Sequence, residues 1–348
     1  MRIPGSALLH RLRPRELRSL ISHFGRPISA SYRYGIRLRR IHDRTRAIGE
    51  NDIIAVVVLR DEAPRIPYFL SYYRRLGVNH FLFVDNGSTD GFRDLVAAEP
   101  DCSVWYTEDS YKHANFGEHW ANYLLRRYGT DHWCLRIDVD EFLVHPHYDT
   151  RNLHELTAHL DETGKLSFFT LLLDMYSQGP LDEAIYTVGQ DPLEVCPWFD
   201  PYGYCQWKMP MGDWWIQGGV RRRVFYSNGH VGAAPALNKF PLVKWRRYYS
   251  YISSTHFLTP RRLNRPHYAQ GLAPTGCLLH FKHFASFRTK VEEELERKEH
   301  YNESAEYKLY AAGLTQEEKL VLWNPASARF TGWEQCVDLG LMSLGRWF

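Results

Sequence analysis

The chain has 348 residues, of which 44% are hydrophobic and 15% aromatic, so it can bury a substantial core and is not disordered throughout. Its formal net charge of +3 conceals an asymmetry, because residues 1–50 carry +9 and the remainder carries −6. The six cysteines form no Cys-x-x-Cys pair, which argues against a zinc site or a disulfide framework and favours a reducing compartment. The longest apolar run, Ile53 to Leu59, is far shorter than the roughly 20 residues of a membrane-spanning helix. We therefore expect a cytoplasmic protein, either soluble or peripheral at the inner face of the membrane.

Strand and helix signals alternate from residue 53 onward. Residues 53–59 form a β-branched apolar run typical of a strand buried on both faces, and Pro64 then begins a helix that Gly77 ends. A second helix is expected between residues 116 and 129, and further strands are predicted at 81–84, 102–106, 133–137 and 166–173. This alternation indicates an α/β fold, with a mostly parallel sheet and helices on both faces.

The alternation fades beyond about residue 175. Residues 196–215 are rich in Trp, Tyr and Phe, and we expect most of these rings to form a satellite core and one or two to contact an acceptor. Arg221 to Arg223 are assigned to a strand, and residues 277–281 to another. Residues 286–311 have the charge pattern of an amphipathic helix.

Polar clusters follow three of the predicted strands at their carboxyl ends, where open α/β sheets bind ligands. One of them, Asp138-Val139-Asp140, places two carboxylates on either side of an apolar residue after a buried strand. Such a pair can bind one hard cation, Mn²⁺ or Mg²⁺, which would neutralise charge on a diphosphate leaving group. The alternative is a solvated turn, since Asp-x-Asp also occurs by chance.

Three motifs in order favour the metal-binding interpretation. They are Val-Val-Leu-Arg-Asp-Glu-Ala at 57–63, Phe-Val-Asp-Asn-Gly-Ser-Thr-Asp-Gly at 83–91 and Leu-Arg-Ile-Asp-Val-Asp-Glu-Phe-Leu at 135–143. Together they resemble the family-2 glycosyltransferases, and most closely a bacterial branch with an Asp-x-Asp-Glu-Phe signature. The resemblance covers residues 53–175 and continues more loosely through 218–225 and 278–282. It implies a GT-A nucleotide-diphospho-sugar fold, a metal-bridged nucleotide-sugar donor that is typically UDP-linked, and usually inversion at the anomeric carbon.

The resemblance also implies roles for single residues. Asp138 and Asp140 match the site of the metal and the diphosphate. The loop of Arg60, Asp61 and Glu62 matches the segment that lies against the nucleotide, although the family more often has Asn at position 61. The resemblance further assigns contact with the nucleotide base to Asp85, at the end of the second strand.

Several assignments have a plain structural alternative. Asp85 can instead belong to a tight turn with local side-chain hydrogen bonds. His280 is a candidate third metal ligand and Lys282 a candidate diphosphate contact, but the pair can equally be a core histidine beside a surface lysine. His256 is a weaker candidate of the same kind.

An inverting transferase needs a general base for the acceptor hydroxyl. Asp213 and Asp174 are the candidates that the sequence offers. Asp213 directly precedes two tryptophans, and desolvation by such neighbours raises the pKa of a carboxyl group. No Glu-Asp dipeptide, on which many family members build this base, follows the Asp138-Val139-Asp140 motif.

The predicted organisation has three parts: a basic N-terminal arm over residues 1–50, a GT-A catalytic domain over 51–285 and a C-terminal helical extension over 286–348. Within the catalytic domain, residues 51–175 are the nucleotide-sugar half and 176–285 the acceptor half. The expected partners are a nucleotide-sugar donor, a glycan or lipid-linked acceptor and, through the arm, an anionic membrane surface.

Two other functions compete with this interpretation. A nucleotidyltransferase shares the sheet and the two-acid site, but it usually has a glycine-rich basic loop after the first strand, where this chain has Arg-Asp-Glu-Ala-Pro. A nucleic-acid or membrane binder without catalysis would use the arginine-rich arm. We expect no nucleic acid, because the body is net negative and contains no recognisable nucleic-acid motif.

Overall fold

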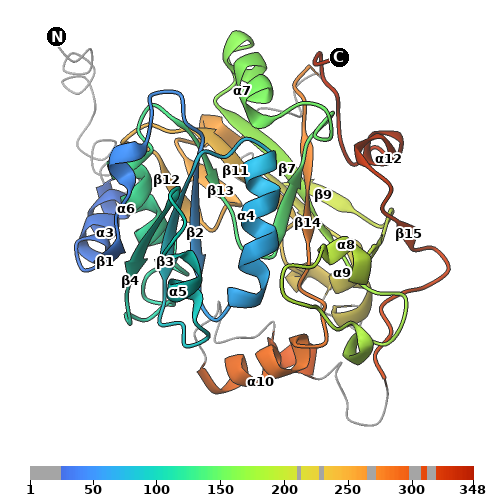
Figure 1. Cartoon of the computed structure of the whole chain (residues 1–348). Helices are drawn as coiled ribbons and strands as arrows, with labels where there is room; N and C mark the ends of the chain where they lie inside the picture. Colours follow the sequence, from blue (N-terminus) through green and yellow to red (C-terminus); the bar gives the residue numbers. More distant parts are fainter. Residues whose placement is uncertain (1–24, 210–212, 227–230, 265–271, 298–306, 312–318) are drawn as a thin grey trace.

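The computed structural model describes residues 25–209, 213–226, 231–264, 272–297, 307–311 and 319–348. Its centre is a mixed sheet of nine strands, with helices packed around it (Figure 1). In spatial order the strands are β1 (Arg39–His42), β4 (Cys102–Tyr106), β3 (His80–Asp85), β2 (Ile54–Leu59), β5 (Trp133–Arg136), β11 (Asn238–Lys244), β7 (Ser167–Asp174), β14 (Gly276–His280) and β6 (Glu141–Val144).

The five strands predicted in the first half of the chain are all present, within one or two residues of their expected ends. Strands β4, β3, β2 and β5 are parallel, and so are β7 and β14. The remaining strands β1, β11 and β6 run in the opposite direction to these. Every residue of β2 is buried, as its apolar composition predicted, and every residue of β3 is buried as well. The α/β class is therefore confirmed, with a sheet that is mixed rather than wholly parallel.

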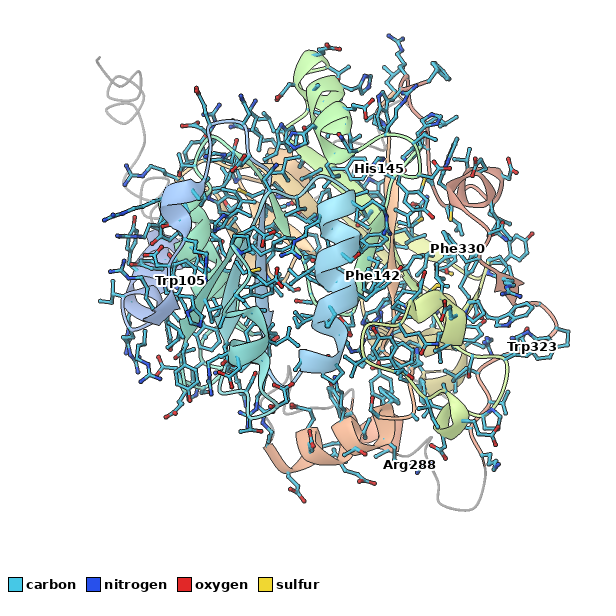
Figure 2. All side chains as sticks on the ribbon, viewed as in Figure 1. Trp105, Phe142, His145, Arg288, Trp323 and Phe330 are labelled. Carbon is cyan, nitrogen blue, oxygen red and sulfur yellow. The ribbon has the colours of Figure 1, made fainter. Side chains whose placement is uncertain are left out.

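Helices cover both faces of the sheet. Helix α4 (Ile66–Arg75) packs on the face that bears Phe81 and Phe83, which its own Phe69 contacts. Helix α6 (Glu118–Tyr128) covers the other face, where its N-cap Gly117 approaches Val58. Phe142 of β6 adds to the core beneath α4 (Figure 2).

Shorter elements complete the described part of the chain. The helices are α3 (Arg26–Gly35), α5 (Phe92–Val96), α7 (Leu153–Glu162), α8 (Pro192–Val195), α9 (Gly219–Phe225), α10 (Phe287–Arg297) and α12 (Trp333–Asp338). Three two-stranded sheets pair β9 (Cys205–Lys208) with β10 (Trp214–Gln217), β12 (Ser250–Ser253) with β13 (Phe257–Thr259), and β8 (Trp198–Phe199) with β15 (Ala328–Arg329).

The described part of the predicted N-terminal arm belongs to the sheet domain. Strand β1 extends the sheet at β4, and α3 packs on α6. A Cβ at Gly35 would overlap the ring of Tyr123, so only glycine lets the two helices approach this closely. The buried guanidinium of Arg126 donates to Ser31 Oγ of α3 at 2.5 Å. Residues 26–50 are thus not a separate arm, and residues 1–24 lie outside the described residues.

The C-terminal region is only partly helical. The helix predicted over 286–311 is present as α10 and as a short helical segment at 307–311, while 298–306 lie outside the described residues. Downstream, β15 returns to pair with β8, and Arg151 donates to the carbonyl of Phe348 at 3.1 Å. In the parts of the chain that the structure describes, no helix has both the length and the apolar character needed to cross a membrane.

Candidate functional site

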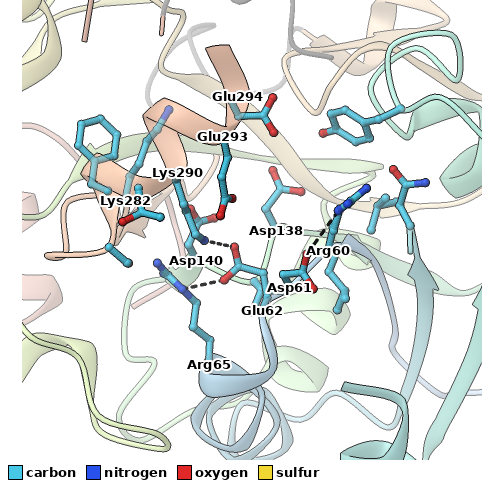
Figure 3. A pocket seen from close by; sticks show the side chains of 18 of the residues that line it. Arg60, Asp61, Glu62, Arg65, Asp138, Asp140, Lys282, Lys290, Glu293 and Glu294 are labelled. Carbon is cyan, nitrogen blue, oxygen red and sulfur yellow. Dashed lines mark hydrogen bonds and ion pairs between the residues drawn. The ribbon is translucent and has the colours of Figure 1, made fainter. Parts of the chain in front are cut away.

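A cavity of about 450 Å³ lies at the carboxyl ends of the parallel strands, between the sheet and α10 (Figure 3). Residues far apart in the sequence meet there, from the loops after β2 and β5, from the end of β14 and from α10. Seven of the predicted site residues line it: Arg60, Asp61, Glu62, Asp138, Asp140, His280 and Lys282. The other three predicted residues, Asp85, Asp174 and Asp213, are not among its lining residues.

Asp138 is fixed from inside the protein by a buried arginine. Arg136, the last residue of β5, places Nη1 at 2.9 Å from Asp138 Oδ1 and Nη2 at 2.9 Å from Glu118 Oε1. The side chains of Arg136 and Glu118 are almost fully buried, whereas that of Asp138 is 39% exposed. Burial raises the pKa of Glu118, and Arg136 opposes this shift. The carboxylate of Asp138 is therefore held at the mouth of the cavity by a chain that begins in the core.

Asp140 is fixed by a second buried chain. Arg221 Nε lies 2.8 Å from Asp174 Oδ2, and Asp174 Oδ1 lies 2.7 Å from His280 Nδ1. The opposite ring nitrogen, Nε2 of His280, points to Asp140 Oδ2 at 3.3 Å. Asp174 thus orients the imidazole toward the cavity, with the remaining nitrogen directed at the carboxylate of Asp140.

The contacts among Arg221, Asp174, His280 and Asp140 determine the protonation states of these side chains. Burial alone would lower the pKa of His280, but Asp140 and Asp174 raise it to about 9. Burial likewise favours the neutral form of both aspartates. At Asp140 the charge of His280 outweighs this effect of burial. At Asp174 the charges of Arg221 and His280 outweigh it. The pKa values of both aspartates therefore fall well below the usual range. The site therefore contains a charged imidazole between two carboxylates near neutral pH.

The candidate base Asp174 does not fit that role in this geometry. Its side chain is only 1% exposed, and both carboxylate oxygens are engaged by Arg221 and His280. The strand predicted for Arg221 is in fact helix α9, which turns this arginine into the core behind the site. Gly218 caps the helix and Gly219 begins it, and both have a positive φ. Asp174 is a positioning residue here.

The loop after β2 is tied to both sides of the cavity. Asp61 adopts a left-handed φ of 52°, and its Oδ1 accepts from the backbone N–H of Thr89 at 2.7 Å. Glu62 pairs with Arg65 at 2.8 Å and also with Lys290 of α10. Figure 3 shows these two ion pairs meeting at the carboxylate of Glu62. The acidic loop thus connects the turn after β3 to α10.

Asp85 faces its own turn rather than the cavity. It is fully buried, and it accepts from the N–H of Ser88 at 2.7 Å and from Arg93 Nη1 at 2.8 Å. This geometry agrees with the alternative in which Asp85 belongs to a tight turn with local side-chain hydrogen bonds. The next residue, Asn86, lines both the main cavity and an adjoining cavity of about 460 Å³. Tyr111 also lines both cavities.

Asp213 and His256 are likewise engaged away from the cavity. Asp213, just before β10, pairs with Arg261 at 3.0 Å. His256 Nδ1 lies 2.7 Å from the carbonyl oxygen of Asn238, and burial lowers the pKa of His256 to about 3. In the predicted aromatic cluster, Trp215 stacks on Phe257 with ring centroids 5.8 Å apart, while Trp207 is 38% exposed. The cluster is thus part core and part surface.

One wall of the cavity was not predicted as part of the site. Helix α10 contributes Lys290, Glu293, Glu294 and Arg297. Their spacing of three or four residues places them on one face of a helix. This periodicity is visible in the sequence, but it marks only a polar helix face and not the cavity that the face meets.

The donor groups at the site suit a hard cation only in part. Asp138 and Asp140 supply carboxylate oxygens, and His280 Nε2 could join them as a ligand only after the imidazole gives up its proton, because a metal binds the neutral ring. Within the described ranges, however, no three His, Cys, Asp or Glu side chains are arranged as a ready metal site. A cation bound here would therefore need oxygens from a substrate and from water, as Mg²⁺ commonly does at phosphates.

Comparisons with known proteins do not assign this chain to a group. No family model matches it, and no curated protein matches it. The functional argument therefore depends on the geometry of the cavity and on the motifs that line it.

Proposed function

We propose that the protein is a metal-dependent glycosyltransferase with a GT-A fold, which transfers a sugar from a nucleotide-diphospho-sugar to a glycan or lipid-linked acceptor. UDP is the preferred nucleotide, and inversion at the anomeric carbon is the expected outcome. The observation that carries this proposal is the convergence of Asp138, Asp140, His280 and Lys282 on one cavity at the carboxyl edge of the sheet. That edge is where open α/β sheets bind their ligands.

Asp138, Asp140 and His280 are the residues that would hold the cation. When bound, Mn²⁺ or Mg²⁺ would supply positive charge to offset the charge that develops on the diphosphate leaving group. Lys282 adds a fixed cation on the same side, because its Nζ lies 4.7 Å from the ring centroid of Tyr310 and 4.9 Å from that of Tyr307. Lys290 and Arg60 border the same space. These side chains favour an anionic group such as a diphosphate.

The adjoining cavity is the place we propose for the nucleoside. It shares Arg60, Asn86 and Tyr111 with the main cavity, so a ligand can extend from one into the other. Tyr111 offers an aromatic surface and Asn86 an amide for hydrogen bonding to a base. In this arrangement Asp85 shapes the turn that carries Asn86.

Glu293 is the cavity carboxylate best placed to act as the general base. Asp138 and Asp140 are assigned to the cation, Asp61 bonds to Thr89, and Glu62 and Glu294 are ion-paired. Glu293 is exposed and extends from α10 toward Asp140 (Figure 3). It would take the proton of the acceptor hydroxyl as the hydroxyl oxygen bonds to the anomeric carbon, while the sugar–phosphate bond breaks and the nucleoside diphosphate leaves.

Product analysis with a panel of nucleotide-sugars and Mn²⁺ tests the proposal. We expect release of UDP from one or more UDP-sugars, dependent on Mn²⁺ and abolished in Asp140→Asn. Asp161→Asn, which alters a surface aspartate paired with Lys244, serves as the matched control and should remain active. Formation of pyrophosphate from UTP and a sugar 1-phosphate would instead identify a nucleotidyltransferase. Equal UDP release by wild type and Asp140→Asn would contradict the assigned site.

A further inference from the structure

Helix α3 presents an outward face that joins arginines to exposed apolar side chains. Ser31 and Gly35 face inward, toward α6. The outward residues, which we call the α3 face, are Arg26, Ser29, Tyr32 and Arg33 of the helix, Ile36 and Arg37 directly after it, and Arg40 of β1. Ile36 is 70% exposed and Tyr32 is 41% exposed, so both protrude among the guanidinium groups.

The charge of this face is of one sign. Residues 26–40 contain five arginines and no acidic residue. Two carboxylates from outside the segment approach it, since Asp109 pairs with Arg37 at 2.5 Å and Asp43 pairs with Arg40 at 2.8 Å. Both of these arginines nevertheless keep more than half of their side-chain surface exposed. The face therefore keeps a net positive charge on a body that is net negative.

The face is preformed by its packing on the domain. Arg126 of α6 bonds to Ser31 of α3 and to the carbonyl of Tyr249, and Tyr32 meets Tyr123 edge to face at 5.9 Å. A ligand surface would thus meet ordered side chains, without first having to fold the helix.

We infer that the α3 face docks on the surface of an anionic bilayer. Its arginines contact lipid phosphates while Tyr32 and Ile36 enter the boundary between head groups and acyl chains. A helix that carries basic residues beside exposed aromatic and aliphatic side chains binds membranes in this way. The inference is independent of the catalytic proposal, because α3 lies at the side of the sheet whereas α10 and the cavity lie beneath its carboxyl end (Figure 1).

The apolar side chains favour a membrane over a nucleic acid. Binding to phosphates of a duplex uses basic and polar groups and gains little from an exposed isoleucine. Insertion of Ile36 removes apolar surface from water, which a bilayer provides and a phosphate backbone does not. Binding should therefore depend on both Ile36 and the arginines.

Co-sedimentation of the full chain with vesicles tests the inference. Wild type should pellet with mixed phosphatidylcholine–phosphatidylglycerol vesicles, not with pure phosphatidylcholine, and high salt should release it. Because each basic residue near an anionic surface contributes about fivefold to binding, Arg33→Gln with Arg37→Gln should weaken it roughly twentyfold. Ile36→Ser should weaken it severalfold, with unchanged circular dichroism.

Matched controls alter equally exposed residues elsewhere. Ile185 is also 70% exposed, so Ile185→Ser controls for Ile36→Ser. Arg75→Gln with Arg329→Gln removes two exposed charges far from α3 in sequence. The inference is overturned if wild type ignores anionic vesicles, if the α3 variants bind as their controls do, or if binding to a DNA duplex competes with vesicles and survives Ile36→Ser unchanged.

Discussion

The two walls of the cavity are held in place by different means. On the strand-end wall, Asp138 and Asp140 are each fixed by buried ionic chains that begin at Glu118 and Arg221. On the α10 wall, Phe287 and Val291 are buried in an apolar cluster, and the ionic tie to the strand-end loop is the Glu62–Lys290 pair, in which the lysine side chain is 37% exposed. Buried pairs are costly to disrupt, whereas exposed pairs contribute little. The difference indicates that the strand-end carboxylates are preorganised for a ligand, while the exposed charged side chains of α10 can adjust to it.

Breaking the chain behind Asp138 should give the largest effect. Arg136→Met leaves Glu118 buried without its partner, so we expect a loss of about 3–5 kcal/mol in the free energy of unfolding. Urea denaturation measures this loss. The double variant Arg136→Met with Glu118→Gln should recover much of it, because no uncompensated charge remains. A loss below about 1 kcal/mol in the single variant would show that the pair is not buried as described.

Breaking the chain behind His280 should weaken ligand binding. In Asp174→Asn a neutral amide replaces the carboxylate that orients His280. Changes to residues that orient a metal ligand cost about 10–100-fold in metal affinity. We expect a comparable loss in Mn²⁺-dependent UDP affinity by calorimetry. Asp200→Asn is the control, since Asp200 pairs with Arg223 and does not line the cavity. Equal affinities in the two variants would remove Asp174 from the positioning role.

The buried His145 contrasts with His280, because desolvation and not an ion pair dominates its pKa. Burial lowers the pKa of His145 to about 4, and this residue lies at the opposite end of the fold from Arg288 of α10 (Figure 2). Because its folded pKa is below the unfolded value of about 6.5, its stabilising contribution is complete above pH 6.5 and is lost as the pH falls toward 4. The loss should reach about 2 kcal/mol at pH 5.

The measurement is the free energy of unfolding at pH 7 and pH 5 for wild type and His145→Gln. The variant should lose about 2 kcal/mol less than wild type between the two values. Other buried histidines contribute equally to both proteins and cancel in this difference. An identical pH dependence in the two proteins would contradict the neutral state of His145.

The smallest expected change in stability is on the α10 wall. Lys290→Met removes the partly exposed pair with Glu62 and should alter the free energy of unfolding by less than about 1 kcal/mol. UDP affinity should nevertheless fall, because a cation is lost from the cavity. Lys319→Met, which removes an exposed pair with Glu183, should leave affinity unchanged. A large loss of stability in Lys290→Met would show that α10 is as rigid as the strand-end wall.

The same contrast explains what the sequence allows one to predict. Buried strands such as residues 54–59 and 102–106 are continuous apolar runs, and polar residues that follow parallel strands must share one edge of the sheet. Asp138, Asp140 and the loop at Arg60 could therefore be placed together from local patterns. The resemblance to family-2 glycosyltransferases pointed to the same residues, and its functional content remains a prediction.

The missed features depend on contacts between distant segments. The pairing of Arg221 with Asp174 requires a helix that begins at Gly218 and Gly219, and the local run of three arginines equally permits an edge strand. The orientation of Asp85 depends on Arg93 and on the turn at Ser88. Likewise, nothing local to Lys290 or Glu293 shows that α10 crosses the cavity. Tertiary packing decides these cases, and a single sequence does not encode it in any local pattern.

Calorimetric titration of UDP with and without Mn²⁺ tests the central claim most directly, namely that Asp138 and Asp140 form a metal-dependent diphosphate site. Wild type and the control Asp161→Asn should bind UDP only when Mn²⁺ is present. Asp140→Asn should lose this Mn²⁺-dependent binding while keeping the melting temperature of a folded protein. Undiminished UDP binding by Asp140→Asn in the presence of Mn²⁺ would contradict the account.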